Sequence, residues 1–346
     1  MGIKLGIAVV TRKTRMQGLR ERYATASMAA FALGQAQVHE RARRAAHDSR
    51  GNPAKAATRQ VSRAVPETDY DETAEATIRA YQQEDDAYRG SLEALERELD
   101  FGLPIKFVDR DFVPNFEFQT CELVVVVGQD GLVANVAKYV RHLPIVAVNP
   151  DPLRIDGVLL PFKTNQARRA VGRVLEGKAK VRPVTLAEVE LNDGQRLLAF
   201  NDFFLGAASH VSARYVLRVQ DREEPQSSSG VLVSTGAGST GWFSSVFNMV
   251  QGVAAWQGES VSVGQQLPWE DRRLLWAVRE PFASKHSHTN LVAGLLDAGQ
   301  ELILESLMPA GGVVFSDGIE ADALQFNSGA IARVRAAEQR ANIVVG

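Results

Sequence analysis

An apolar run at residues 123–127, in which four of the five residues are valine, leads directly into a polar turn at residues 128–131. A short apolar run bounded by glycine is typical of a strand covered on both faces, as in a parallel α/β sheet. Beyond the turn, apolar residues recur at helical spacing over residues 133–140. The pattern therefore predicts a buried strand, a sharp turn and a helix.

Other segments extend this unit in the first half of the chain. Apolar runs at residues 4–11, 103–109 and 144–149 predict three more strands. Residues 69–99, dense in Ala, Glu and Arg, predict one long helix, and residues 25–66 a helix followed by a loop. The resulting β-α-β-α-β order indicates a right-handed, mostly parallel sheet.

From about residue 164 the pattern changes to short apolar or alternating runs. After a short helix at residues 166–175, we expect strands at residues 184–190, 196–201, 213–219, 230–234, 274–278, 291–296, 301–305, 312–315 and 331–335. Many short strands at close spacing favour a sandwich-like, all-β architecture. The sequence thus predicts an α/β domain followed by a β-rich domain, in keeping with a length of 346 residues.

Composition and charge are those of an ordinary soluble globular protein, with 45% apolar and 23% charged residues. The net charge of −2 gives no indication of a nucleic-acid or membrane-surface partner. Cys121 is the only cysteine, which excludes an intrachain disulfide and a thiolate metal cluster. No apolar run reaches the length of a membrane span and no signal peptide is recognisable, so we expect a cytoplasmic protein.

The turn at residues 128–131 has the composition of a phosphate-binding site. Its glycines let the backbone approach an anion, and the first N–H groups of the following helix would face that anion. Asp130 would place a free carboxylate in the mouth of the site, or alternatively serve as the N-cap of an ordinary strand–helix turn. Ligands of such sheets bind beyond the carboxyl ends of the strands, where the turn at residues 149–152 also lies.

A second glycine-rich segment, GAGSTG at residues 236–241, matches the dinucleotide fingerprint GxGxxG, with Glu259 near the position of its acidic residue. Because it lies late in the chain and within the β-rich part, we interpret it as a loop that packs closely on a polar ligand. Asn201 and Asp202 end a predicted strand, where an amide beside a carboxylate could bind a ribose or a carboxamide. The alternative for this pair is a turn, which both residue types favour.

Two further features carry weaker chemical signals. The basic segment at residues 12–22 is either a solvated surface or a loop that meets phosphates. His286 and His288 would share one face of an extended segment, but two histidines without a third ligand are a weak metal signal. We therefore predict no protein-bound metal site.

Taken together, the order and spacing of three motifs resemble the NAD kinase family. The motifs are GQDGL at residues 128–132, ND at residues 201–202 and STGAGSTGW at residues 234–242. The resemblance is closest to the mitochondrial-type branch, and five further segments carry it: VVTRKTR at 9–15, VNPDPLRIDGVLLP at 148–161, SSG at 228–230, WAVREPF at 276–282 and SDGIEADALQFNSGAIARV at 316–334. It spans nearly the whole chain, apart from about residues 30–65.

This resemblance implies the fold shared by NAD kinases and diacylglycerol kinases. A parallel-sheet α/β domain would occupy residues 1–163 and be joined by the tail from about residue 322 to residue 346, and a sandwich-like domain would occupy residues 164–321. The activity implied is transfer of the γ-phosphoryl group of ATP to the 2′-OH of the adenosine ribose of NAD. Mg²⁺ would be held largely by the ATP, and the chain would form a homodimer or a larger homo-oligomer.

The resemblance also implies roles for individual residues. Asp130 would orient the ribose hydroxyl and take its proton. Asn201 and Asp202 would hold part of the NAD, and the glycine-rich loop up to Trp242 would line the dinucleotide. Besides Asp130, the residues expected to contact a nucleotide are Gly128, Gly131, Asn149, Asn201, Asp202, Thr235, Gly238, Ser239, Thr240 and Trp242.

Three positions depart from the family motifs. Gln129 stands in place of a glycine and Leu132 in place of a threonine, and both bear on ATP binding. Trp242 replaces a tyrosine and keeps an aromatic stacking face. The alternatives are therefore a kinase of the same fold that phosphorylates another nucleotide or a lipid, and a dinucleotide-binding sensor without catalytic activity.

Overall fold

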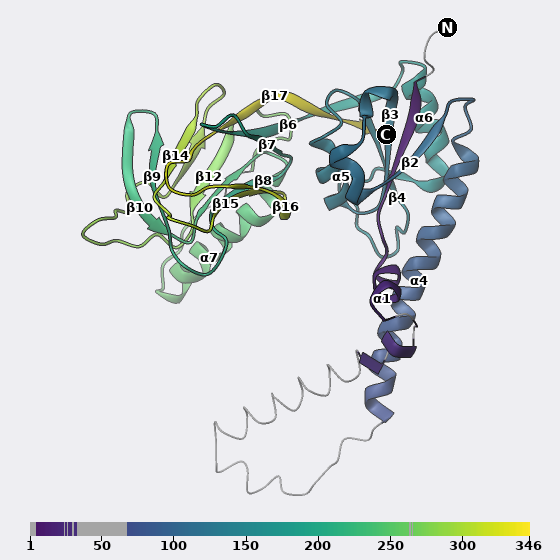
Figure 1. Ribbon diagram of the computed structural model, residues 1–346, viewed down its shortest axis with the longest axis horizontal. Coiled ribbons are helices and arrows are strands. Elements are labelled where there is room, and N and C mark those ends of the chain that lie inside the picture. The colour runs from purple at the N-terminus through teal and green to yellow at the C-terminus, as the bar shows by residue number, and fades with distance from the viewer. Residues whose placement is uncertain are drawn as a thin grey trace, which may run out of the picture.

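The computed structural model describes residues 5–23, 25, 27–29, 31–32, 68–262, 264 and 266–346, with the backbone alone for residues 68–75. Figure 1 shows two lobes joined by the long strands β6 (Lys180–Leu191) and β17 (Ile331–Val345). The first lobe holds strands β1 to β5, helices α1, α4, α5 and α6 and the 3₁₀ turns η1 to η3, and the second lobe holds the other elements apart from β6 and β17, which run through both. Most of the helix and loop expected at residues 25–66 lies outside the described residues.

The first lobe is built on a parallel sheet. Strand β3 lies between β1 and β4, and the pairs β1–β2, β1–β3, β3–β4 and β4–β5 are all parallel. The strands are β1 (Gly6–Thr11), β2 (Ile105–Asp109), β3 (Cys121–Val127), β4 (Pro144–Asn149) and β5 (Phe162–Lys163). The predicted parallel sheet is confirmed, and the bounds of β1 to β4 lie within about two residues of those expected.

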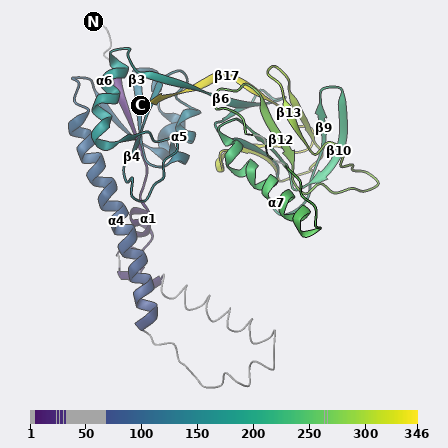
Figure 2. The ribbon, with the colours of Figure 1, turned by 180° about the vertical axis from the view of Figure 1, so that it is seen from behind.

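Helices cover both faces of this sheet. Helices α4 and α6 lie on one face, and α5 lies on the other, between the sheet and the second lobe (Figure 1, Figure 2). Val124 and Val126 of β3 pack beneath α5, whereas Leu123 and Val125 pack beneath α4 and α6. The strand is apolar throughout because both of its faces are buried. The helices are α1 (Arg15–Tyr23), α4 (Thr68–Glu98), α5 (Asp130–Ala137) and α6 (Ala167–Leu175), with the 3₁₀ turns η1 (Arg110–Asn115), η2 (Phe118–Thr120) and η3 (Thr164–Gln166).

The second lobe is a sandwich of two antiparallel sheets. One has the order β13-β12-β11-β8-β15-β16, and the other continues the sheet of the first lobe through β17 to β14, β9 and β10, with β6 and β7 alongside. Buried residues of both sheets, among them Phe203 and Tyr215, share one core, which confirms the sandwich-like prediction. The remaining elements are β7 (Arg196–Ala199), β8 (Asp202–Ala207), β9 (Ala213–Val219), β10 (Arg222–Ser228), β11 (Val231–Ser234), η4 (Gly238–Thr240), α7 (Trp242–Trp256), β12 (Leu274–Val278), β13 (Ala293–Leu296), β14 (Leu302–Ser306), β15 (Gly312–Ser316) and β16 (Ile319–Gln325). No helix in the described part of the chain is long and apolar enough to cross a membrane.

Strand β17 joins the parallel sheet of the first lobe to one of the two sheets of the second lobe, so that they form a single sheet. Its first residues pair with β14 in the second lobe, whereas Asn342 and Ile343 pair in parallel with β4 in the first lobe. The strand was predicted to span only residues 331–335. It continues to Val345 because buried residues recur along it beyond the break in its pairing with β6, up to Val344.

Four strands were not predicted, namely β5, β8, β10 and β16. Asn201 and Asp202 do not end a strand, because Asp202 is the first residue of β8. In β10 the buried positions are polar, and Gln226 and Ser228 both bond the hydroxyl of Tyr215 at 3.0 and 2.7 Å. An alternation between polar residues leaves no hydrophobic signal, which explains why the sequence did not indicate this edge strand.

The two-sided burial of β3 can be tested by truncating one of its side chains. Replacing Leu123 by alanine should lower the free energy of unfolding by about 2–5 kcal/mol, because the side chain is fully buried and leaves a cavity. The matched control is Leu153→Ala, which should change it by less than about 0.5 kcal/mol because Leu153 is 94% exposed. Urea unfolding followed by circular dichroism measures both, and equal losses in the two variants would contradict the core described here.

Candidate functional site

A cavity of about 540 Å³ lies between the two lobes, and we call it the Asp130 cavity. Its lining comes from the start of α5, the loop before β5, the start of β8, the glycine-rich loop, the segment before β12 and the turn between β15 and β16. The lining residues are Asp130, Gly131, Val158, Leu159, Asn201, Asp202, Ala237, Thr240, Gly241, Trp242, Trp269, Asp317 and Gly318. Three motifs that are far apart in the sequence therefore meet at one place.

Of the residues singled out in the sequence, six line this cavity: Asp130, Gly131, Asn201, Asp202, Thr240 and Trp242. The other five, Gly128, Asn149, Thr235, Gly238 and Ser239, lie behind the lining and shape the segments that form it. Five further lining residues were missed: Val158, Leu159, Trp269, Asp317 and Gly318. Asp317 has two local signals, the Asp-Gly dipeptide typical of a two-residue hairpin turn and its place in the family-like segment at residues 316–334, and neither indicates the cavity.

Asp130 is the first residue of α5, and Gln129 before it occupies the N-cap position. The carboxylate of Asp130 is therefore not the N-cap group. Its Oδ1 atom accepts the backbone N–H of Leu159 at 2.7 Å, which fixes the side chain at the rim of the cavity. A negative charge at this end of a helix is favourable because it faces the positive end of the helix dipole.

The two unusual residues of the turn lie in different environments. Gln129 is exposed, whereas Leu132 is buried in the core beneath α5. A Cβ atom on Gly128 would come within 2.8 Å of Leu132 Cδ2, so Leu132 fills the space beside this glycine. Leu132 therefore packs inward and does not narrow the cavity.

Asn149 shapes the loop that follows β4. Its Nδ2 atom donates to the carbonyl oxygen of Ile155 at 2.9 Å, and its Oδ1 atom accepts the N–H of Asp151 at 3.0 Å. Gly157, in the left-handed region with φ +67°, lies close enough that a Cβ atom would come within 2.7 Å of Asn149 Nδ2. These contacts carry the loop back to Leu159, where it meets Asp130.

The glycine-rich loop packs backbone against backbone on the entry to β8. A Cβ atom on Gly238 would clash with the carbonyl group of Asn201. Thr235 Oγ1 donates to Phe200 O at 2.6 Å, and Ser239 Oγ donates to Gly236 O at 2.7 Å. These two hydroxyls therefore hold the loop itself, which leaves Thr240 and Trp242 at the cavity.

Asp317 organises the backbone around Asn201 and Asp202. Its carboxylate, 2% exposed, accepts the backbone N–H groups of Phe200 at 3.0 Å, Asn201 at 2.6 Å and Asp202 at 3.3 Å. The backbone N–H of Asp317 in turn donates to Asp202 O at 3.0 Å. Asp317 and Gly318 have φ values of +54° and +69°, as a two-residue hairpin turn between β15 and β16 requires.

Two carboxyl groups thus lie close together in an environment of low polarity. Burial raises the pKa of Asp202 to about 7, and the negative charge of Asp317 adds to the shift. Burial also raises the pKa of Asp317, but the Lys138 ammonium and three backbone N–H groups counteract the increase. Because Asp317 has these donors, it holds the negative charge, and Asp202 is the carboxyl that changes protonation near neutral pH.

Aromatic side chains form part of the cavity wall. Trp242 stacks on Phe204 and Phe315, with ring centroids 5.8 and 6.4 Å apart, and the Arg279 guanidinium lies 5.4 Å from its ring centroid. Trp269 contributes a second indole to the lining. A cavity with flat apolar surfaces, carboxyl groups and an amide suits a ligand that has both a ring and sugar hydroxyls.

Metal ligation is not apparent in the described part of the chain. No group of three or more His, Cys, Asp or Glu side chains among those residues is arranged to hold a metal ion.

No family model matches the chain. Three curated NAD kinases are similar to part of it: that of Chlorobaculum tepidum is 25% identical over 127 residues, that of Psychrobacter arcticus 27% over 146 residues and that of Alcanivorax borkumensis 29% over 132 residues. These matches cover 36%, 40% and 36% of this chain, and 44%, 43% and 43% of the respective relatives. The chain thus spans less than half the length of the curated relatives it matches.

Two solved structures are similar over more of the chain. Yeast NADH kinase in complex with NADH has a TM-score of 0.55 at 16% identity, covering 99% of this chain and 84% of that one. An NAD kinase from Archaeoglobus fulgidus in complex with ATP has a TM-score of 0.49 at 17% identity, covering 73% and 86%. The likeness to the yeast protein shows the fold, and the partial sequence matches are to proteins named as NAD kinases.

The raised pKa of Asp202 predicts how the stability of the fold depends on pH. An unfolded aspartate has a pKa of about 3.9, so between about pH 4 and 7 the folded state binds the extra proton and loses stability as pH rises. Asp202→Asn removes this cost and should raise the free energy of unfolding at pH 8 by on the order of 2 kcal/mol, with little change at pH 4.5. Urea unfolding at the two pH values measures this difference, and a variant less stable than the wild type at pH 8 would contradict the assignment.

Proposed function

We propose that the chain is a member of the NAD kinase family and transfers the γ-phosphoryl group of ATP to the 2′-OH of the adenosine ribose of NAD. The observation that carries the proposal is the meeting of Asp130, the pair Asn201 and Asp202, and the loop before Trp242 around one cavity. These are the three motifs that resemble the family, and they come from two different lobes. The curated relatives are named as NAD kinases, which supports the same activity.

Asp130 is the general base in this proposal. Its carboxylate takes the proton of the ribose 2′-OH while the hydroxyl oxygen attacks the γ-phosphorus and ADP leaves. The N–H of Leu159 occupies Oδ1, so the side chain is held in place and Oδ2 is available to the substrate. Mg²⁺, bound to the ATP phosphates, would neutralise their charge during the transfer.

The remaining lining residues bind the dinucleotide in our proposal. Asn201 and Asp202 hydrogen-bond its ribose or carboxamide, and Trp242 offers a face to one of its rings. Thr235, Gly238 and Ser239 act by holding the glycine-rich loop in shape, and Gly128 and Asn149 do the same for the turns beside Asp130, with the consequence that these five residues influence binding indirectly.

The finer parts of the proposal rest on the sequence motifs. We assign the chain to the mitochondrial-type branch and take it to act in the cytoplasm as a homodimer. We further propose that the lobes are separate domains, an α/β domain at residues 1–163 joined by the tail at residues 322–346, and an NAD-binding domain at residues 164–321. Strand β17, which pairs with β4, supports the return of the tail to the first domain.

The experiment that tests the proposed function is NADP formation by the purified protein with NAD, ATP and Mg²⁺. Asp130→Asn should lower kcat by about 10²–10⁴-fold, because the variant loses its general base, and should leave the Kd for NAD within about twofold. Asp156→Asn, an exposed carboxylate in the loop of Leu159, is the matched control and should keep wild-type activity.

Two results would count against the proposal in different ways. A wild-type protein that binds NAD but forms no NADP would favour a dinucleotide sensor, as would be expected if Gln129 and Leu132 had ended the use of ATP. An Asp130→Asn variant with wild-type kcat would retain the kinase but remove Asp130 from the role of base.

A further inference from the structure

The C-terminal end of α5 bears a buried cation that the proposed mechanism does not use. Lys138 is the C-cap residue of α5, and its side chain is only 2% exposed. Its Nζ atom donates to Ser316 Oγ at 2.8 Å and to Asp322 Oδ2 at 3.3 Å, and lies 4.0 Å from Asp317 Oδ2. All three partners belong to the β15–β16 hairpin of the second lobe, so Lys138 connects the lobes.

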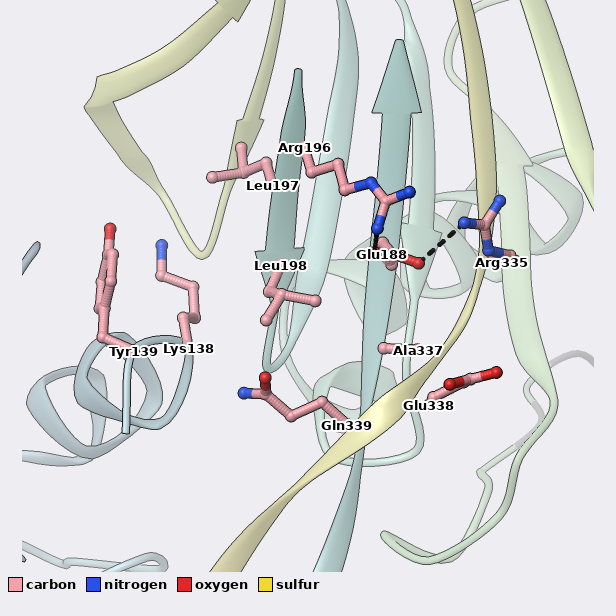
Figure 3. Close-up of a pocket in the computed structure, with 10 residues that line it drawn as sticks. All are labelled: Lys138, Tyr139, Glu188, Arg196, Leu197, Leu198, Arg335, Ala337, Glu338 and Gln339. Carbon is pink, nitrogen blue, oxygen red and sulfur yellow. Dashed lines mark ion pairs between the residues drawn. The ribbon is translucent and has the colours of Figure 1, made fainter. Parts of the chain in front are cut away.

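Tyr139 reinforces the same contact. Its hydroxyl donates to Asp322 Oδ2 at 2.7 Å, and burial together with Asp322 raises its pKa, which keeps the hydroxyl protonated. Asp322 Oδ1 is buried without a hydrogen-bond partner among the described residues. Lys138 and Tyr139 are therefore the groups that hold this carboxylate, and Figure 3 shows their side chains projecting together from the end of α5.

A second cavity, of about 690 Å³, opens directly beside this contact. It is lined by Lys138 and Tyr139 on one side and by residues of β6, β7 and β17 on the other, as Figure 3 shows. On the opposite wall, Arg196 and Arg335 pair with Glu188 at 3.8 and 3.0 Å. Because open space separates the lobes here, the polar contacts of Lys138 and Tyr139 join them next to the cavity.

The first residue of α5 lines the Asp130 cavity, and the C-terminal end of α5 contacts the hairpin that also lines this cavity. Asp130 begins the helix at the Asp130 cavity, and Lys138 follows its last residue, about 12 Å away at 1.5 Å per residue. The hairpin that Lys138 holds carries Asp317, whose carboxylate fixes the backbone of Asn201 and Asp202. A series of contacts therefore runs from Asp130 along α5 to Lys138 and from Lys138 to the hairpin. It continues from Asp317 in the hairpin to the backbone of Asn201 and Asp202.

We infer that Lys138, with Asp317 and Asp322, is a clamp that fixes Asp130 relative to Asn201 and Asp202. The effect of this clamp on catalysis rests on the proposed function. Its effect on the placement of the two lobes does not depend on that function. Lys138 is a positioning residue, since its ammonium meets carboxylates and a hydroxyl of the hairpin and does not line the Asp130 cavity. Phosphoryl transfer is sensitive to such placement because it depends mainly on alignment of the reacting groups.

The placement of the lobes can be measured without any activity. Spin labels at Leu153→Cys in the first lobe and Val211→Cys in the second, which are 94% and 58% exposed, report one distance between the lobes when Cys121 is replaced by alanine. Double electron–electron resonance should give a narrow distribution of distances between the two labels in the otherwise wild-type protein. In Lys138→Met this distribution should be broader or shifted. The control Lys178→Met, at an exposed lysine paired with Glu176, should match the wild type.

Kinetics then separate positioning from general destabilisation. Lys138→Met should lower kcat by about 10²-fold, the cost of an ångström-scale misplacement, with KM for NAD within about threefold. In an Asp130→Asn background the same substitution should have almost no further effect on kcat, because the group that it misplaces is already absent. A loss of equal size in both backgrounds would show a merely structural role.

Two additional variants keep the inference open to refutation if Lys138→Met folds poorly. Tyr139→Phe removes only the hydroxyl that bonds Asp322 and should give a smaller change in the same direction. Lys138→Met combined with Asp322→Asn removes one positive and one negative charge, so the net buried charge is that of the wild type. This double variant should fold but should not recover the narrow distribution of distances. An unchanged distribution in every folded variant would overturn the clamp, whereas an inactive wild type with an altered distribution in Lys138→Met would overturn only the proposed function.

Discussion

Three backbone N–H groups at the entry to β8 find their acceptor in one side chain, the carboxylate of Asp317. A buried N–H group needs an acceptor, and here one carboxylate supplies it for three consecutive residues. The carbonyl group of Asn201, on the same stretch, accepts the N–H of Thr235 from the glycine-rich loop at 2.9 Å. The hairpin, the start of β8 and the loop are thereby held together, and the side of the Asp130 cavity that the second lobe contributes depends on these contacts.

The other side of the cavity is supplied by a separate layer of the molecule. The parallel sheet presents the turn before α5 at its carboxyl edge, where parallel α/β sheets bind ligands. Continuous pairing through β17 and β6 sets the gross arrangement of the lobes, and the contacts of Lys138 with the β15–β16 hairpin set the local one. A division of this kind suits a reaction in which a nucleophile and a phosphate must be brought into line.

The sequence predicted the parts of this architecture that hydrophobic pattern and local motifs encode. Both faces of β3 are covered, so its apolar run was informative, and the three family-like motifs do meet at one cavity. Asp317 could not be found in this way, because its role depends on contacts with residues more than a hundred positions earlier in the chain. The hydroxyls of Thr235 and Ser239 were expected at the ligand, but a motif does not reveal which way a side chain turns.

The central claim is that the Asp130 cavity holds the adenosine ribose of NAD with its 2′-OH as the phosphoryl acceptor. Phosphorus NMR of the products formed from NAD and ATP tests this claim most directly, since it identifies the hydroxyl that carries the new phosphate. We predict a single new monoester at the 2′ position of the adenosine ribose and an equal amount of ADP. A monoester at another hydroxyl, or ADP without any phosphorylated dinucleotide, would contradict it.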